Sequence, residues 1–112
     1  MEIGFQTAKL KKECDDFKLL RKVHGEHRAK LIRRRLDAII AAVVLEDLRN
    51  APGRLHELKG DRQGQLSLDL DGPYRLILVP AHNPVPMRAG GGMDWSQITA
   101  VTVLGIEDTY ER

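Results

Sequence analysis

The sequence predicts an α+β domain in which two N-terminal helices pack on a small antiparallel β-sheet. Up to residue 50, apolar residues recur at helical spacing, whereas Leu66, Leu68 and Leu70 alternate with polar residues, as in a half-buried strand. The segment Asn50-Ala51-Pro52-Gly53 separates the two patterns and is a strong stop signal for a helix. With 112 residues the chain is long enough for one hydrophobic core, so we expect a single domain over residues 1–112.

The first helix is predicted to begin near Ala8, because Thr7 is a favourable N-cap. Its apolar positions lie at i, i+4 and i+7 and are Leu10, Cys14 and Phe17. This spacing assigns Cys14 to the core rather than to a nucleophilic site. A short strand over Glu2–Phe5 is predicted to precede the helix.

Gly25 separates this helix from a second one, predicted from about Glu26 to about Val43, with one more turn over Leu45–Leu48. The apolar stripe of the second helix is Ile32, Leu36, Ile39, Ile40 and Val43. Such a stripe is typical of a helix that packs on a core with one face.

The same helix carries the densest basic stretch of the chain, which comprises Arg28, Lys30, Arg33, Arg34 and Arg35. The net charge of the whole chain is only +2, but residues 1–50 hold 12 basic and 8 acidic residues, whereas residues 51–112 hold 6 and 8. A basic stretch can bind RNA, DNA or an acidic protein surface. It can equally be the solvated face of an amphipathic helix, which is the preferred interpretation on charge alone.

The second half of the chain is predicted to be a sheet with strands at Arg54–Leu58, Leu66–Leu70, Tyr74–Val79 and Ile98–Ile106. Asp71-Gly72 is the strongest hairpin signal. A long loop over Pro80–Trp95 contains Gly90-Gly91-Gly92, which lacks the Gly-Lys-Ser/Thr of a phosphate-binding loop and is expected to be a flexible hairpin loop.

Several residues capable of phosphodiester chemistry occur near the ends of these strands. His56, Lys59 and Arg62 lie within seven residues of each other. Arg75 comes from the neighbouring strand, and Asp108 and Tyr110 stand near the C-terminus. Cations neutralise a phosphate and titratable groups move protons, so this set suits a phosphodiester substrate. From spacing alone, however, charged residues at strand ends are most often ordinary surface residues.

A resemblance favours the chemical interpretation. The run from Leu55 to Ser67, followed by Gly72-Pro73-Tyr74-Arg75-Leu76, resembles the HigB-like branch of the RelE/ParE toxin superfamily. Leu45–Leu48 and the terminal Ile106–Tyr110 resemble the same family, so the similarity extends from about Phe5 to Tyr110. It implies a small antiparallel sheet with helices on one side, and a type II toxin that acts as a ribosome-dependent mRNA endoribonuclease and inhibits translation. It also implies an antitoxin encoded beside the toxin, helix-turn-helix and HigA-like, and neither metal nor cofactor.

The resemblance also implies roles for individual residues. The family's active-site histidine, lysine and hairpin arginine correspond to His56, Lys59 and Arg75. Its terminal aspartate, tyrosine and histidine correspond to Asp108, Thr109 and Tyr110, so the last two positions depart from the family pattern. The implied roles are transition-state stabilisation by Lys59 and Arg75, and proton transfer by His56 with Asp108 or Tyr110. For such a nuclease we expect contacts with the RNA backbone from Arg62 and from the basic helix residues Arg28, Lys30, Arg33, Arg34 and Arg35.

The alternative is a binding module of the same fold without cleavage, either an inhibitor of gyrase type or an inactive toxin relative. The missing terminal histidine favours it, and the retained His56, Lys59 and Arg75 disfavour it. A general protein-interaction domain with a basic face is a third, less favoured hypothesis. No apolar run approaches the ~18 residues of a membrane helix, and the first twenty residues lack the apolar core of a secretory signal. The single cysteine fits a reducing cytoplasm.

Overall fold

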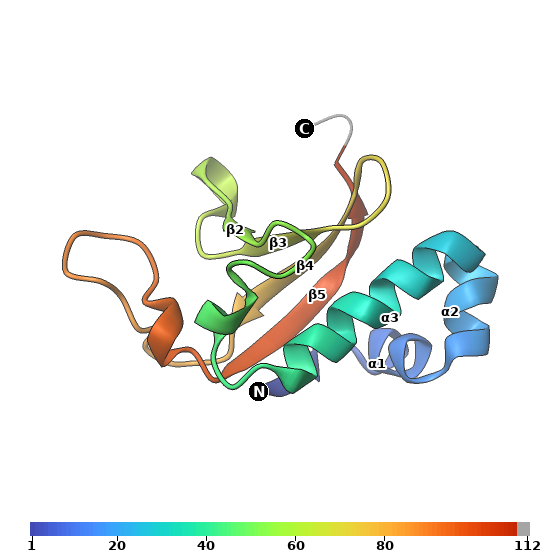
Figure 1. The fold of residues 1–112 in the computed structure, drawn as a ribbon, viewed down its shortest axis with the longest axis horizontal. Helices are drawn as coiled ribbons and strands as arrows, with labels where there is room; N and C mark the ends of the chain where they lie inside the picture. The colour runs from blue at the N-terminus through green and yellow to red at the C-terminus, as the bar shows by residue number, and fades with distance from the viewer. Residues whose placement is uncertain (110–112) are drawn as a thin grey trace.

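The computed structural model describes residues 1–109 and shows a five-stranded sheet with three α-helices (Figure 1). The strands are β1 (Glu2–Phe5), β2 (His56–Glu57), β3 (Leu66–Asp69), β4 (Tyr74–Pro80) and β5 (Ala100–Asp108). Their order is β1-β5-β4-β3-β2, and all neighbours are antiparallel except β1 and β5, which are parallel. The predicted α+β fold is confirmed, but the sheet is mixed. No hairpin joins β1 to β5, so no tight turn imposes an antiparallel arrangement on this pair.

The helical region contains three helices instead of the two predicted: α1 (Ala8–Asp15), α2 (Phe17–His24) and α3 (Glu26–Ala41). The first predicted helix is interrupted at Asp16, whose backbone is extended. The Asp16 carboxylate accepts hydrogen bonds from the backbone N–H groups of Lys18 and Leu19 and so caps α2. An aspartate that satisfies two free N–H groups stabilises the start of a new helix.

The core lies between α3 and one face of the sheet. Its buried helix residues are Ala29, Ile32, Leu36 and Ile39, and its sheet residues include Leu66, Leu68, Leu76, Leu78 and Val103. Cys14 also belongs to this core, as predicted, and burial raises the pKa of its thiol to about 11. The prediction was wrong for Ile40 and Val43, which are 52% and 75% exposed, because the helix ends at Ala41 and Ala42 takes the last buried position.

The connections differ in detail from the prediction. Strand β2 is limited to two residues, because Arg54 has a φ of 48°, outside the strand region. The Asp71-Gly72 hairpin is confirmed, with the N–H of Tyr74 donating to the carbonyl of Asp71 at 3.0 Å. Short 3₁₀ turns, η1 (Leu45–Leu48), η2 (Gly60–Arg62) and η3 (Trp95–Gln97), join the main elements.

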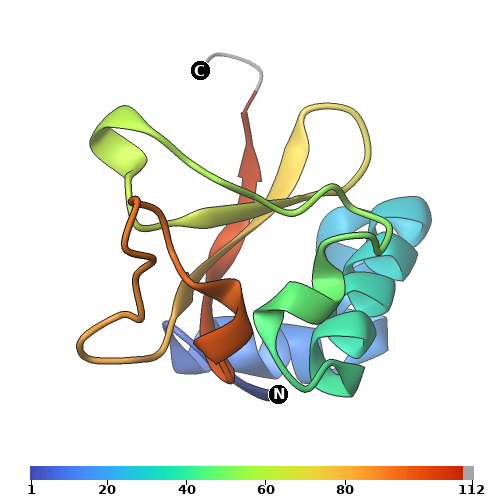
Figure 2. The ribbon, with the colours of Figure 1, turned by 60° about the vertical axis from the view of Figure 1, so that its left-hand side comes forward.

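The 81–94 loop folds back toward the η2 turn (Figure 2). Its tip is a hairpin in which Met87 bridges Met93 and the N–H of Arg88 donates to the carbonyl of Gly92 at 2.9 Å. The loop is tied to β2 through the Glu57 carboxylate, which accepts hydrogen bonds from the N–H of Met93 at 3.3 Å and the indole N–H of Trp95 at 3.2 Å. The glycine-rich segment is therefore a hairpin loop, as expected.

Gly53 is a position at which only glycine fits, and it gives the first prediction. Its φ is 111°, and an added Cβ would lie 2.7 Å from Arg35 Nε and 3.0 Å from a Leu68 methyl carbon. Gly64 has a φ of 97° but open space around it. We expect Gly64→Ala to cost only the backbone strain, about 1 kcal/mol, and Gly53→Ala to cost roughly 1–3 kcal/mol more from overpacking. Urea unfolding measures the loss of stability in both variants. Equal losses would show that the Arg35 side chain on α3 moves aside for the added Cβ at no cost.

Candidate functional site

A small pocket opens on the face of the sheet opposite the core. It has a volume of about 150 Å³ and is lined by His56, Leu58, Arg62, Ser67, Arg75, Ile77 and Thr109. The strand register explains the grouping, since His56 pairs with Ser67, Ser67 with Ile77, and Asp69 with Arg75. Side chains alternate between the two faces of a sheet, so these residues point away from the leucines that pack on α3. We refer to this cavity as the open-face pocket.

His56 is held in one orientation by its own chain. Its Nδ1 lies 2.9 Å from the carbonyl oxygen of Arg54. A carbonyl only accepts, so Nδ1 carries the proton and donates it, which leaves Nε2 of the neutral ring with a lone pair. The uncommon positive φ of Arg54 turns this carbonyl toward the ring. The geometry therefore presents His56 as a proton acceptor through Nε2.

The two arginines of the pocket are fixed by carboxylates and carbonyls. Arg75 Nη1 donates to the carbonyls of Gly72 and Tyr74 at 2.8 and 2.9 Å, and its Nε lies 2.9 Å from Asp69. Arg62 makes two parallel bonds of 2.8 Å to Glu107. Hydrogen bonding to Glu107 raises the pKa of Arg62. Such paired geometry orients the planar guanidinium groups before any ligand arrives.

Asp69 was not predicted as part of the site, and Glu107, although it stands beside Asp108 near the C-terminus, was given no role. A signal for Asp69 existed, because the alternation of Leu66, Leu68 and Leu70 places Asp69 on the polar face and the Asp71-Gly72 hairpin fixes its register with Arg75. Glu107 of β5 is the register partner of Arg75 on β4. Its contact with Arg62 spans 45 residues and depends on the η2 turn, which no local pattern reports.

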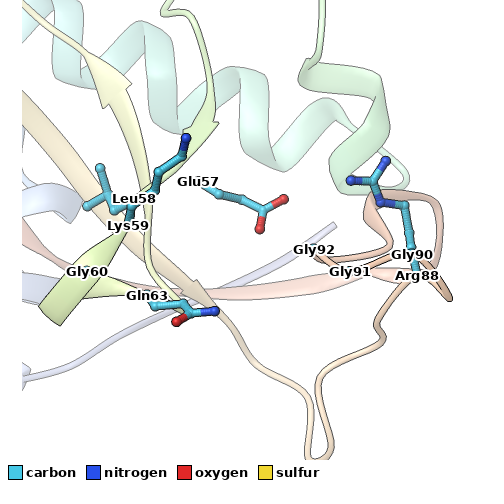
Figure 3. A pocket seen from close by; sticks show the side chains of 9 residues that line it. All are labelled: Glu57, Leu58, Lys59, Gly60, Gln63, Arg88, Gly90, Gly91 and Gly92. Atoms are coloured by element: carbon cyan, nitrogen blue, oxygen red, sulfur yellow. The ribbon is translucent and has the colours of Figure 1, made fainter.

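The structure does not bring all predicted catalytic residues together. Lys59 is exposed and lines a neighbouring pocket instead (Figure 3). Asp108 pairs with Tyr74, and strand alternation places it on the helix side of the sheet, where its charge acts on Arg28. Tyr110 lies outside the described residues. The open-face pocket thus unites His56, Arg62 and Arg75, but neither Lys59 nor Asp108.

Three of the five basic helix residues join α3 to other elements. Arg28 binds Asp71 through two bonds of 2.8 and 3.1 Å and stacks on the Tyr74 ring at 3.4 Å. Arg33 donates to the carbonyl of Cys14, and Arg35 donates to that of Asp69. Lys30 lies 3.5 Å from Glu26. Arg34 is exposed, and its side chain makes no hydrogen bond or ion pair within residues 1–109.

Other kinds of site find no support in the part of the chain that the structure describes. Within it, no three His, Cys, Asp or Glu side chains are grouped so that they could hold a metal ion. None of its helices is long and apolar enough to cross a membrane. A histidine acceptor that lines one cavity with two oriented guanidinium groups is an arrangement whose chemistry suits an anionic ligand.

A comparison with protein families identifies the family of the chain. Residues 3–85 match the family described as RelE-like toxin of type II toxin-antitoxin system HigB. The chain therefore belongs to the HigB-like family of type II toxins, whose partner is an antitoxin, and the resemblance found in the sequence is confirmed. The match includes His56, Lys59, Arg62 and Arg75 and ends before β5. No curated protein matches the chain.

The Arg28–Asp71 pair predicts a stability that depends on pH. The hydrogen bond to Arg28 lowers the pKa of Asp71 below its ordinary value of 3.8. The unfolded chain thus binds the proton more readily, and the stability from this pair is present above pH 3.8 and is lost as the pH falls through the lower folded-state pKa. We expect Asp71→Asn to cost roughly 1 kcal/mol at pH 7 and progressively less below about pH 4.

The control is Asp37→Asn, which removes an exposed i,i+4 pair with Arg33. This variant should cost about 0.3–0.5 kcal/mol at most. Both are measured by urea unfolding between pH 2 and 7. A cost of Asp71→Asn that stays constant over this range would contradict the assignment of the pair.

Proposed function

We propose that this toxin is a ribosome-dependent mRNA endoribonuclease that inhibits translation by cutting messages. The observation that carries the proposal is the open-face pocket, in which His56, oriented by the bond of its Nδ1 to the Arg54 carbonyl, lines the same cavity as Arg62 and Arg75. RNA supplies its own nucleophile, the 2′-hydroxyl, so the enzyme needs to align it, remove its proton and stabilise the charged transition state. The proposed reaction requires no metal.

In the proposed mechanism His56 Nε2 takes the proton of the 2′-hydroxyl. The freed oxygen attacks the adjacent phosphorus, and the bond from phosphorus to the 5′-oxygen breaks. The products are a cyclic phosphate and a free 5′-hydroxyl. Arg75 stabilises the charge on the phosphorane oxygens, Arg62 binds the RNA backbone, and Lys59 contributes a phosphate-binding cation from the neighbouring pocket.

A second group must donate a proton to the leaving 5′-oxygen. Of the two predicted partners of His56, Asp108 lies on the helix side of the sheet. We therefore assign the acid role to Tyr110, which follows the pocket residue Thr109 in sequence. A tyrosine is protonated at neutral pH, with a reference pKa of about 10, so it can donate but does not readily accept.

The basic helix contributes RNA contacts through its free cations in this proposal. Arg28, Arg33 and Arg35 have structural partners, whereas Arg34 is exposed and Lys30 has only a long contact with Glu26. The antitoxin is proposed to be a small helix-turn-helix protein of HigA type encoded beside the toxin. A reading frame for such a protein next to the toxin gene is the simplest test of this partner.

The second candidate is a binding module of the same fold without cleavage, for example a gyrase inhibitor. One observation favours it: Arg62 and Arg75 are already neutralised by Glu107 and Asp69, so RNA has to compete with these carboxylates. Induced cells discriminate the two functions, because cut messages identify the nuclease and damaged DNA identifies the gyrase inhibitor. No cleavage of any message by the unmodified chain would favour the binding module.

The role of His56 gives a direct prediction. His56→Gln should slow single-turnover cleavage of messages on programmed ribosomes by roughly 10²–10⁴-fold, because a general base contributes that much. His27→Gln is the control, since His27 is an exposed histidine at the start of α3. Equal rates of His56→Gln and unmodified toxin at saturation would remove His56 from the proton path.

In the same assay, Tyr110→Phe should be similarly slow if its hydroxyl is the acid, and nearly unaffected if the ring only stacks.

The role of Arg34 is tested by salt. Phosphate contacts release counterions, so affinity falls with salt concentration. Arg34→Gln should lower the slope of log affinity against log salt by about 1 for ribosome association without changing the stability of the fold. Arg28→Gln should instead destabilise the fold, because it removes the ion pair between Arg28 and Asp71. An unchanged slope in Arg34→Gln would show that Arg34 contacts no phosphate and that this face of α3 is only solvated.

A further inference from the structure

A larger pocket lies beside the open-face pocket, and Lys59 is the only residue of its lining that the mechanism above uses. It has a volume of about 580 Å³ and lies between the β2–η2 segment and the tip of the 81–94 loop (Figure 3). Its lining comprises Glu57, Leu58, Lys59, Gly60, Gln63, Arg88 and Gly90–Gly92. We call it the loop groove. Leu58 lines both cavities, so the two are adjacent.

The loop groove carries two cations whose charge is available. Lys59 and Arg88 are exposed, and neither side chain makes a hydrogen bond or an ion pair with another residue in the range 1–109. In Figure 3 the Glu57 carboxylate lies between them, but its oxygens already accept bonds from Met93 and Trp95. Arg62 and Arg75 of the open-face pocket are, by contrast, each held by a carboxylate. Lys59 and Arg88 therefore lack an ion-pair partner within residues 1–109, and with the Glu57 carboxylate included the lining of the loop groove keeps one net positive charge.

The loop places Arg88 in a defined position. The bridge between Met87 and Met93 fixes the hairpin, and the N–H of Gly91 donates to the Arg88 carbonyl at 3.0 Å. The guanidinium group packs on Gly92, where an added Cβ would lie 2.8 Å from Arg88 Nη2. Because Glu57 ties the hairpin to β2, Arg88 is held on the opposite wall from Lys59.

An apolar surface adjoins the two cations. A neighbouring cavity of about 250 Å³ shares Glu57, Gln63 and Gly92 with the loop groove and adds Val85, Met87 and Met93. Met87 is 58% exposed, although it is a large apolar residue. Flexible, polarisable methionine side chains adapt to flat ligand surfaces. A phosphate between two cations next to an apolar wall matches the chemistry of one nucleotide, whose base is flat and whose linkage is anionic.

We propose that the loop groove is a second nucleotide subsite, which binds a nucleotide flanking the cleaved bond. Lys59 and Arg88 hold its phosphate, and Met87 contacts its base. This inference rests on the proposed nuclease function and adds Arg88 as a substrate-positioning residue. RNA is favoured over an acidic protein segment because the loop groove shares Leu58 with the pocket that holds His56, so an extended substrate could occupy both cavities.

The test uses programmed ribosomes with a message that carries a 2′-deoxy nucleotide at the cleavage site and is therefore bound but not cut. Single flanking phosphates on either side are replaced in turn by an uncharged methylphosphonate. We expect one such replacement to weaken binding of the unmodified toxin and of Arg88→Lys by about three- to tenfold, the size of one charge-assisted contact. The same replacement should have a clearly smaller effect on Arg88→Gln, because only the Lys59 contact with that phosphate remains.

Lys9→Gln serves as the control, since Lys9 is an exposed cation on α1. It should retain the full methylphosphonate effect, and urea unfolding verifies that all variants are folded. With an all-ribose message, Arg88→Gln should require more toxin for half-maximal cleavage but reach the same rate at saturation. Equal sensitivity of unmodified toxin and Arg88→Gln at every flanking phosphate would overturn the subsite. So would an Arg88→Gln defect confined to antitoxin binding, which would make the loop groove a protein-docking surface.

These outcomes are separate from a failure of the proposed function. The uncuttable message reports binding alone, so a coupling between Arg88 and one phosphate would identify the subsite even in a toxin that does not cleave. Conversely, cleavage that depends on His56 but shows no coupling to Arg88 would leave the nuclease in place and remove the subsite.

Discussion

One aspartate joins the helical layer, the sheet and the site. The side chain of Asp69 contacts Arg75 Nε on β4 and accepts a bond from Arg54 Nε, each over about 3 Å. Its backbone N–H donates to the carbonyl of Gly53, and its carbonyl accepts from Arg35 on α3. Gly53 and Arg54, which connect the helical region to β2, are thus held against Asp69 of β3. Since the Arg54 carbonyl orients His56, the proton acceptor of the site depends on the same network.

The positive charges around the site are divided into two kinds. Arg62 and Arg75 gain orientation from their carboxylates but lose net charge, whereas Lys59 and Arg88 keep their charge but lack fixed partners within residues 1–109. In the proposed nuclease, oriented groups suit the reacting phosphate, because stabilising a transition state requires donors that are already in place. Free charges suit recognition of the backbone, where attraction over distance matters more than direction.

The general fold was predictable because its signals are local. The change of period at Pro52-Gly53, the Thr7 cap and the Asp71-Gly72 turn each act within a few residues, and each is observed. The break at Asp16 was missed because helical spacing of apolar residues continues across it. Ile40 and Val43 were assigned to the core because the pattern alone does not show where the helix ends.

The site was predictable only in part. His56, Arg62 and Arg75 lie in adjacent strands and turns, so short-range register brings them together. Lys59 follows His56 by three residues, and the strand ends between them, so sequence proximity did not place it in the same cavity. The position of Arg88 beside the site was not predicted, because the position of a long loop is determined by contacts such as Glu57 with Trp95 rather than by its own sequence.

The parallel pairing of β1 with β5 has a consequence for synthesis of the chain. Strand β1 emerges from the ribosome before the other strands described, and its partner β5 is made nearly a hundred residues later. Until β5 is released, β4 lacks a neighbour on one side and Arg62 lacks Glu107. Helices α1 to α3 can form early, whereas the sheet closes only after β5 has been translated. A nascent copy of this toxin therefore has no complete open-face pocket while β5 is still inside the ribosome that makes it.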